Sequence, residues 1–271
     1  MRHNRTALES FLLRKGAGRG AVFMPYVTAG YPSPGAMPGI FGMLADSGSD
    51  CIELGVPFSD PVADGPIIQA STLAALGAGV TPDSCFRMAE QAARKGLRVI
   101  LMGYANPWMA MGLKNAARRM SDAGVHGVIV PDLPVEEAGP WQSVFSRRGL
   151  GFPLFAAPTT PVPRLRMIDR ASSGFIYYVS VTGVTGERRS FQGGLGGRLS
   201  WMRANLESPV CVGFGVSTPA QVSSLAPLVS GVIVGSALVR RLSEWTQSAQ
   251  NRLKIARWTR SMARASGAAI E

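Results

Sequence analysis

Three carboxylates lie close together in residues 53–64, and their setting suggests acid–base chemistry. Glu53 stands inside the short apolar run 51–54, which fits a buried strand. A buried carboxylate is unfavourable unless it is paired or protonated, and burial raises its pKa toward that of a general acid–base catalyst. Asp60 and Asp64 follow in a segment whose prolines and glycines prevent both helix and strand. The pattern predicts a strand carrying one acid into a pocket and a stiff loop carrying a second.

The same residues also allow a purely structural interpretation. Glu53 could pair with an arginine inside the core, and the two aspartates could simply form turns. This segment alone leaves both interpretations open, so the rest of the chain has to decide between them.

Short apolar runs alternate with longer amphipathic segments along nearly the whole chain. The runs are rich in Val, Ile and Phe, as strands of a parallel sheet buried on both faces are. Eight such units predict an α/β chain folded as a (β/α)8 TIM barrel. Strands are expected at 22–27, 51–54, 99–103, 127–130, 153–156, 175–179, 210–212 and 231–234. Helices are expected at 35–46, 67–78, 84–94, 113–123, 136–148, 163–171, 195–205, 219–225 and, as one long helix, 238–264.

A single domain over residues 1–271 accounts for all of these units. We expect an extra N-terminal helix and lead-in at 1–20, eight β/α units at 21–237, and a C-terminal helix and tail at 238–271. Thr6 and Glu9 have the spacing of a capping box, which would open the N-terminal helix. An open doubly wound sheet is the alternative, and it is less favoured because no Gly-x-Gly-x-x-Gly motif follows the first strand.

Glycine-rich turns follow the last three predicted strands, at 183–186, 213–215 and 235–236. In TIM barrels the active site lies at these carboxyl ends of the strands. Glycine lets backbone N–H groups approach a phosphate closely, and a helix opening at Gly235 would add its dipole. One glycine pair is more often an ordinary turn, but three on consecutive strands predict a phosphate site.

The residue types at the strand ends limit the kinds of reaction that the site could catalyse. No lysine falls there, and neither paired histidines nor a Cys-x-x-Cys motif indicates a metal site. Carboxylates, tyrosines and a phosphate cradle suit proton transfer on a sugar phosphate, or cleavage of a carbon–carbon bond whose leaving group holds the electrons. Tyr26, Leu101 and Phe214 would supply an apolar wall for an aromatic leaving group, although each fits the barrel core equally well.

Composition bears on the location and partners of the chain. The net charge is +11, but it is spread over several predicted helices without a nucleic-acid-binding motif, so nucleic acid is not expected as the main partner. A positive field would still attract a phosphorylated substrate. No apolar run reaches the ~18 residues of a membrane span, and no signal peptide is recognised. Three cysteines without close spacing fit the cytoplasm.

These motifs closely resemble the α subunit of tryptophan synthase. The similarity runs in order from about the first strand to the last, and the segment from Glu53 to Asp64 is its most specific part. The matching stretches are Met24–Gly30, Ile52–Pro66, Tyr104–Pro107, Val130–Pro134, Ser180–Gly186, Gly213–Gly215 and Gly235–Ala237.

The resemblance implies a carbon–carbon lyase of tryptophan biosynthesis. The family cleaves indole-3-glycerol phosphate to indole and glyceraldehyde 3-phosphate in a retro-aldol step without a cofactor. Glu53 would protonate the ring carbon being cut and handle the glycerol hydroxyl proton, and Asp64 would stabilise the indole N–H. The positions that match its substrate pocket are Tyr26, Tyr104, Tyr177 and Phe214 around the indole, Gly186, Gly215, Gly235 and Ser236 around the phosphate, and Thr185 in the closing loop.

The resemblance also implies a partner. Family members work in an α2β2 complex, in which the β subunit carries pyridoxal phosphate and receives the indole. The positions expected to contact the β subunit are Pro57, Asp60, Pro61, Asn106, Pro107, Asp132 and Pro134.

Two alternatives to an α-subunit lyase remain, and the structural role of one glycine-rich stretch is also open. The chain could be an α-like subunit that acts mainly as an allosteric partner of the β subunit, or a stand-alone lyase that releases indole. The two intact acids argue against the first alternative, and the partner-contact motifs argue against the second. The glycine-rich stretch 192–197, which differs from the family pattern, is expected to belong to a lid or to a tolerated surface insertion.

Overall fold

The computed structural model describes residues 5–16, 20–179, 194–213 and 215–267. Eight strands form one sheet within these ranges, in the order β4-β3-β2-β1-β8-β7-β6-β5, and every pairing between neighbours is parallel. The strands are β1 (Val22–Thr28), β2 (Cys51–Gly55), β3 (Arg98–Met102), β4 (Val125–Ile129), β5 (Leu154–Ala156), β6 (Ile176–Val179), β7 (Val210–Gly213) and β8 (Gly231–Val234).

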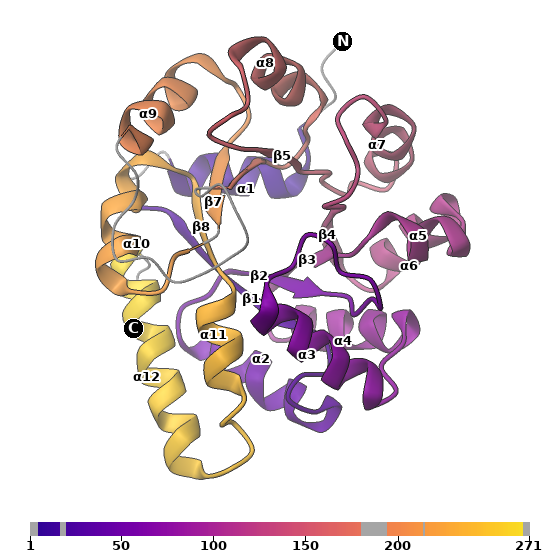
Figure 1. The fold of residues 1–271 in the computed structure, drawn as a ribbon, viewed down its shortest axis with the longest axis vertical. Helices are drawn as coiled ribbons and strands as arrows, with labels where there is room; N and C mark the ends of the chain where they lie inside the picture. Colours follow the sequence, from indigo (N-terminus) through magenta and orange to yellow (C-terminus); the bar gives the residue numbers. More distant parts are fainter. Residues whose placement is uncertain (1–4, 17–19, 180–193, 214, 268–271) are drawn as a thin grey trace.

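The first and last strands of this order meet again. A parallel bridge joins Gly127 in β4 to Gly151, just before β5. The Val128 N–H donates to the Gly151 carbonyl (2.9 Å), and the Gly151 N–H donates to the His126 carbonyl (2.9 Å). The sheet is therefore a nearly closed barrel with helices around it (Figure 1). The predicted TIM-barrel class is confirmed.

Helices follow the strands, as the alternating pattern predicts. An extra helix, α1, precedes β1, and short 3-10 turns occur at Pro34–Ala36 and Ala226–Leu228. The helices are α1 (Ala7–Gly16), α2 (Met37–Asp46), α3 (Pro66–Gly77), α4 (Pro82–Arg94), α5 (Ala105–Met111), α6 (Leu113–Asp122), α7 (Ala138–Ser146), α8 (Val162–Ala171), α9 (Leu195–Asn205), α10 (Pro219–Leu225), α11 (Ser236–Leu242) and α12 (Ala249–Ala265).

The expected single helix at 238–264 is wrong, because α11 ends at Leu242 and α12 begins at Ala249. The two helices have different neighbours: α11 packs against β1 and α3, whereas α12 packs against α10 and α2. Ser248 starts the second helix, since its side chain accepts the N–H of Asn251 (3.0 Å). One straight helix could not cover both surfaces.

The short helix α5 was not expected from the sequence. It begins directly after Tyr104, and its first residue, Ala105, donates its N–H to both carboxylate oxygens of Asp132 (2.9 and 3.2 Å). This contact satisfies an N–H that a helix start leaves without an intrahelical partner. Because Asp132 lies 27 residues further along the chain, local sequence gives no signal for it.

Helix α1 closes the amino-terminal end of the barrel. Its residues Leu8, Phe11 and Leu12 belong to the same apolar cluster as residues inside the barrel. Leu8 is fully buried, and Cβ atoms added at Gly127, Gly151 or Gly174 would each approach its side chain within 3.0–3.3 Å. Three glycines thus make room for one leucine. The larger apolar cluster lies on the other side of the sheet, against the surrounding helices.

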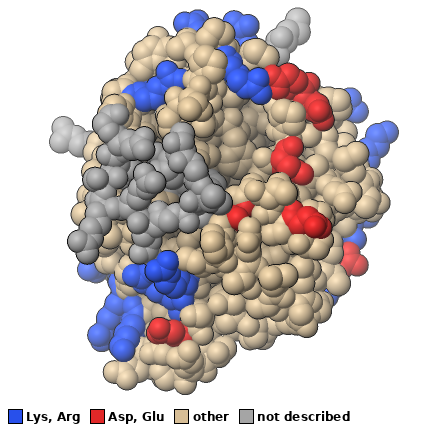
Figure 2. Space-filling model, viewed as in Figure 1, with Lys and Arg blue, Asp and Glu red and all other residues tan. Residues whose placement is uncertain are grey.

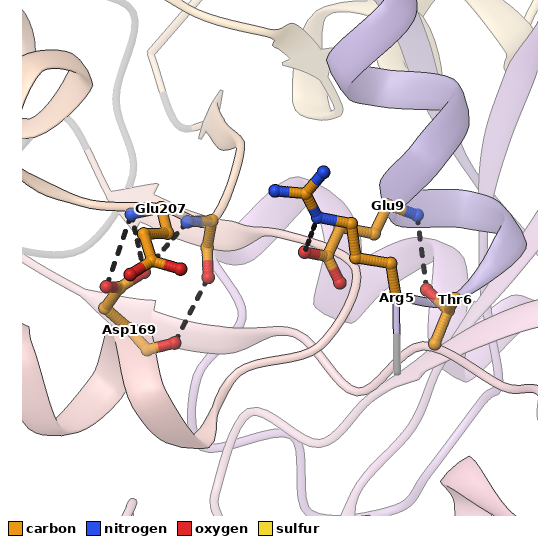
Figure 3. Close-up of polar contacts among 6 residues, drawn as sticks. Arg5, Thr6, Glu9, Asp169 and Glu207 are labelled. Carbon is orange, nitrogen blue, oxygen red and sulfur yellow. Dashed lines mark hydrogen bonds and ion pairs between the residues drawn. The ribbon is translucent and has the colours of Figure 1, made fainter. Parts of the chain in front are cut away.

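Two buried carboxylates away from the barrel mouth have structural partners (Figure 3). Glu9 in α1 pairs with Arg5 (3.7 Å), and its backbone N–H donates to the Thr6 hydroxyl (3.2 Å), as the capping-box spacing predicts. Asp169 in α8 accepts the N–H groups of Glu207 (3.2 Å) and Ser208 (2.9 Å), which precede β7. Asp169 therefore joins α8 to the segment before β7, whereas Glu9 is held within the start of its own helix. In the described residues, no helix has the length and apolar character of a membrane span.

We expect Leu8→Ala to lower the free energy of unfolding by about 2–5 kcal/mol, because a buried leucine is replaced by a cavity over three glycines. The matched control is Leu253→Ala, whose side chain is 58% exposed on α12. It should change stability by less than about 0.5 kcal/mol. Urea unfolding of both variants measures the difference, and equal losses would contradict the role given to α1.

Candidate active site

A pocket opens at the carboxyl end of the barrel strands, in the hollow of the face drawn in Figure 2. Basic side chains form one group over α11 and α12 and further groups along the upper edge of this face, and acidic side chains border the right side of the hollow. The residues that line the pocket are Tyr26, Glu53, Asp64, Gly65, Ile67, Ile68, Met102, Tyr177, Gly215, Val216, Ser217, Ile233, Gly235, Ser236, Ala237 and Arg240.

Glu53 is the buried acid of this pocket. It is 1% exposed, and its Oε2 atom has no hydrogen-bond partner among the described residues. Glu9 and Asp169 are similarly buried but have partners, so burial alone does not explain Glu53. Burial, followed by the nearby Asp64 carboxylate, raises the pKa of Glu53 to about 8. The arginine pairing considered from the sequence is not seen in the described residues, and the side chain is protonated at neutral pH.

The pleat of β2 turns Glu53 inward. Ile52 and Leu54 belong to the cluster under the helices, whereas Cys51 belongs to the barrel interior, on the same side as Glu53. Gly55, the next residue on the inner side, leaves space above the carboxyl group. The Tyr26 ring occupies that space, and a Cβ atom at Gly55 would overlap the tyrosine hydroxyl. A side chain at 55 would therefore displace a wall of the pocket.

Tyr177 repeats this arrangement on the opposite part of the barrel. Its ring lies where a Cβ atom at Gly213 would be, just as the Tyr26 ring lies against Gly55. Both tyrosines are buried and line the pocket beside Glu53, so the structure brings these two predicted positions together. Burial raises the pKa of each phenol well above its ordinary value, so both remain neutral.

Asp64 reaches the pocket from the loop between β2 and α3. Its Oδ2 atom accepts a hydrogen bond from the Tyr104 hydroxyl (3.0 Å), and its backbone carbonyl accepts one from the Gln69 side chain (2.8 Å). Burial raises the pKa of Asp64, while the hydrogen bond from Tyr104 opposes that rise. The structure thus brings together a protonated acid and a second, hydrogen-bonded carboxyl group.

Small and polar residues form another wall. This wall contains Gly215, Gly235 and Ser236, the described residues that the sequence predicts near a phosphate. Ser217 and Arg240 line the same pocket and were missed. Arg240 is four residues after Ser236 in α11, and the i,i+4 spacing that places both on one helix face is the signal that could have found it.

The prediction for Leu101 is wrong. Its side chain belongs to the cluster between the sheet and the helices, and it does not line the pocket. The neighbouring residues Ile100 and Met102 belong to the inner cluster, and Met102 lines the pocket. Consecutive residues of a strand face opposite sides, and β3 is apolar on both, so the sequence shows no alternation to identify the inner face.

Tyr104 contacts Asp64 but is not among the residues that line the pocket. Thr185, Gly186 and Phe214 lie outside the described residues, as do residues 192 and 193 of the glycine-rich stretch, whereas its last three residues begin α9.

The residues predicted to contact a partner lie on three neighbouring segments near the barrel mouth. Asp60, Asn106, Asp132 and Pro134 are exposed, and Pro61 and Pro107 are half-buried. Pro57 is buried at the base of its loop, so its ring is not available to a docking chain. Sequence reasoning missed Val62 and Met109, which are 81% and 63% exposed on the first two of these segments. Single exposed apolar side chains are ordinary on protein surfaces, and these two stand out only because they lie on segments with predicted contact residues.

We expect Glu53 to titrate near pH 8. Its folded pKa of about 8 lies above the ordinary 4.5, so between these values the unfolded chain releases a proton that the folded chain keeps. Its contribution to the free energy of unfolding therefore falls as the pH rises from about 4.5 to about 8. Carbon-13 NMR of the glutamate carboxyls measures the titration directly.

The matched variant for this prediction is Glu53→Gln, which cannot titrate. Its stability relative to the unchanged chain should improve steadily between about pH 5 and about pH 8 in urea unfolding. Stability curves that stay parallel over this range would contradict the raised pKa.

Comparisons with known proteins identify the relatives of this chain. The family model described as "Tryptophan synthase alpha chain" matches residues 13–266. The tryptophan synthase alpha chain of Geobacter sulfurreducens is 43% identical over 222 residues, which cover 82% of this chain and 84% of that one. The corresponding chain of Roseiflexus sp. is 41% identical over 238 residues, covering 87% and 91%.

Solved structures show the same relationship. A chain of Mycobacterium tuberculosis tryptophan synthase superposes with a TM-score of 0.88 at 33% identity, covering 97% of this chain and 99% of that one. Tryptophan synthase subunit alpha of Legionella pneumophila gives a TM-score of 0.87 at 32% identity, with the same coverage. The chain therefore belongs to the tryptophan synthase alpha chain family.

Proposed function

We propose that this chain is the α subunit of a tryptophan synthase and cleaves indole-3-glycerol phosphate to indole and glyceraldehyde 3-phosphate. The observation that carries the proposal is the buried, protonated Glu53, whose Oε2 atom has no hydrogen-bond partner in the described residues. It faces a pocket that also holds Asp64 and a wall of glycines with Ser236. Family membership supports the same reaction.

The proposed role of Glu53 is to move both protons. As a general acid it donates its proton to the indole ring carbon that carries the glycerol chain. As a carboxylate it then accepts the hydroxyl proton from the adjacent glycerol carbon. The carbon–carbon bond breaks, its electrons return to the ring, and the hydroxyl carbon becomes the aldehyde. Glu53 ends protonated, so the cycle is balanced and ready to repeat.

Asp64 has the second proposed role. Protonation of the ring places positive charge on the indole nitrogen, and an ionised carboxylate facing its N–H stabilises that charge. Between them the two acids supply the proton and the charge stabilisation that the cleavage needs, and we therefore propose a reaction without a cofactor. No cluster of groups suited to a metal ion occurs in the described part of the chain.

The walls of the pocket suit the two ends of the substrate. Tyr26, Tyr177 and Met102 form apolar surface for the indole ring. Gly215, Gly235 and Ser236 would offer N–H and hydroxyl donors to the phosphate, beside the positive side chain of Arg240. Thr185, Gly186 and Phe214 remain proposals of the sequence for the same purposes.

The family implies a complex with a β subunit, and we propose an α2β2 assembly in which only the partner carries pyridoxal phosphate. The proposed docking surface comprises Asp60, Asn106 and Asp132 with the exposed Val62 and Met109. The cytoplasm is the proposed location, because all three cysteines are free and buried, as expected in a reducing compartment.

Indole release from indole-3-glycerol phosphate, measured alone and with the β subunit, tests the proposal. Slow release that rises many-fold with the β subunit would support both the lyase and the complex. Release that the β subunit does not change would indicate a stand-alone lyase. No release in either case, with the β subunit still activated, would replace the lyase by a regulatory subunit.

We expect Glu53→Gln to lower kcat by about 10²–10⁴-fold or more while the fold is kept, because the amide is nearly isosteric but cannot donate and accept the proton. Circular dichroism checks the fold, and indole release measures kcat. Glu90→Gln is the matched control, since Glu90 is exposed on α4 and pairs only with Arg94 among the contacts described. Unchanged turnover in Glu53→Gln would remove the role given to this residue.

A further inference from the structure

The hydroxyl group of Tyr104 contacts two consecutive residues of the loop between β2 and α3. It donates a hydrogen bond to Oδ2 of Asp64 (3.0 Å) and accepts one from the backbone N–H of Ala63 (3.0 Å). The hydroxyl is thereby oriented, because its acceptor side is occupied by Ala63 and its proton points at Asp64. Tyr104 itself is 4% exposed and stands outside the pocket lining. Among these two partners, Asp64 lines the pocket and Tyr104 does not.

Other contacts hold Tyr104 in place. The backbone of Tyr104 caps the start of α5, where the next residue, Ala105, donates its N–H to the carboxylate of Asp132. On the other side the Phe58 ring lies 5.3 Å from it, centroid to centroid. The tyrosine is thus held by the loop after β2, the start of α5 and the loop after β4. A rigid side chain of this kind can position a neighbour within hydrogen-bond tolerance.

The surroundings of Asp64 make this hydrogen bond important. The ionisable groups that face it are Glu53 from β2, Tyr26 from β1 and Tyr177 from β6, while Arg240 from α11 lines the same pocket. Burial and the proximity of another acid both favour the protonated form of a carboxyl group. The Tyr104 hydroxyl acts in the opposite direction, since its hydrogen bond lowers the pKa of Asp64.

We propose that Tyr104 is a positioning residue whose hydroxyl holds the Asp64 carboxylate, ionised and correctly directed, toward the aromatic ring of the substrate. This role differs from the one that the sequence predicts for Tyr104, which is to form part of the wall of the indole pocket. A wall residue would act on substrate binding, whereas a positioning residue acts on the step in which charge develops on the ring. The proposal rests on the proposed function for the identity of that step.

Tyr104→Phe tests the proposal, because it removes the hydroxyl and keeps the ring that packs on Phe58. We expect kcat for indole release to fall by about 10- to 10²-fold with little change in KM, since a misdirected catalytic group costs rate and not binding. The pKa of Asp64 should rise without its donor, so the acidic limb of the pH–rate profile should move to higher pH. Tyr31→Phe is the matched control, because it removes a tyrosine hydroxyl hydrogen-bonded to Ser243, outside the pocket.

A double-mutant cycle decides whether Tyr104 acts through Asp64. In an Asp64→Asn background the carboxylate is already gone, so adding Tyr104→Phe should change kcat by less than about 2-fold. Equal losses in the two backgrounds, or a rise in KM with kcat unchanged, would overturn the proposal.

Carbon-13 NMR titration of Asp64 in the unchanged chain and in Tyr104→Phe gives a readout independent of turnover. An upward shift of the Asp64 pKa in the variant is the expected result, and identical titrations would overturn the proposal. If the unchanged chain releases no indole, the proposed function fails, yet this titration still decides whether Tyr104 controls Asp64.

Discussion

The side chain of Glu53 sets the strictest requirement on this fold. Its carboxyl group lies inside the barrel at 1% exposure, and its Oε2 atom finds no hydrogen-bond donor in the described part of the chain. A group in this condition lowers stability, and it is tolerated only where the surrounding structure is rigid enough to hold it. The remainder of the barrel can be understood as the framework that supplies this rigidity while it leaves one side of the carboxyl group open.

Close packing at both ends of the barrel provides that framework. At the amino-terminal end, Leu8 of α1 fills the space left by three glycines, and the bridge at Gly127 and Gly151 joins the edges of the sheet. At the mouth, Tyr26 and Tyr177 lie against glycines of neighbouring strands. The two ends therefore use glycine in the same way, to admit a large side chain from another element. At the amino-terminal end the leucine fills the barrel, whereas at the mouth the two tyrosines form walls of the pocket.

The second acid depends on long-range contacts of another kind. Asp64 lies on a loop, and its direction is set by Tyr104, which is 40 residues away in the sequence. Tyr104 is in turn held by contacts that involve Phe58 and Asp132, on segments that also carry the predicted partner contacts. The surface proposed for docking and the hydrogen bond to Asp64 thus share the same structural elements. This arrangement gives a physical route by which a partner could affect the reaction, through a few rigid contacts.

Sequence patterns were enough to predict the eight β/α units, the acid on the second strand, and the family resemblance of the motifs around Glu53, Asp64 and the glycine turns. These features are local, because hydrophobic runs, prolines and glycines act on their immediate neighbours. Three features appear only in the folded barrel: Met102 and not Leu101 faces the pocket, α11 and α12 are separate helices, and the Tyr104 hydroxyl contacts Asp64. The reason is physical: a strand buried on both faces shows no polar alternation, and contacts between distant segments exist only once the barrel brings them together.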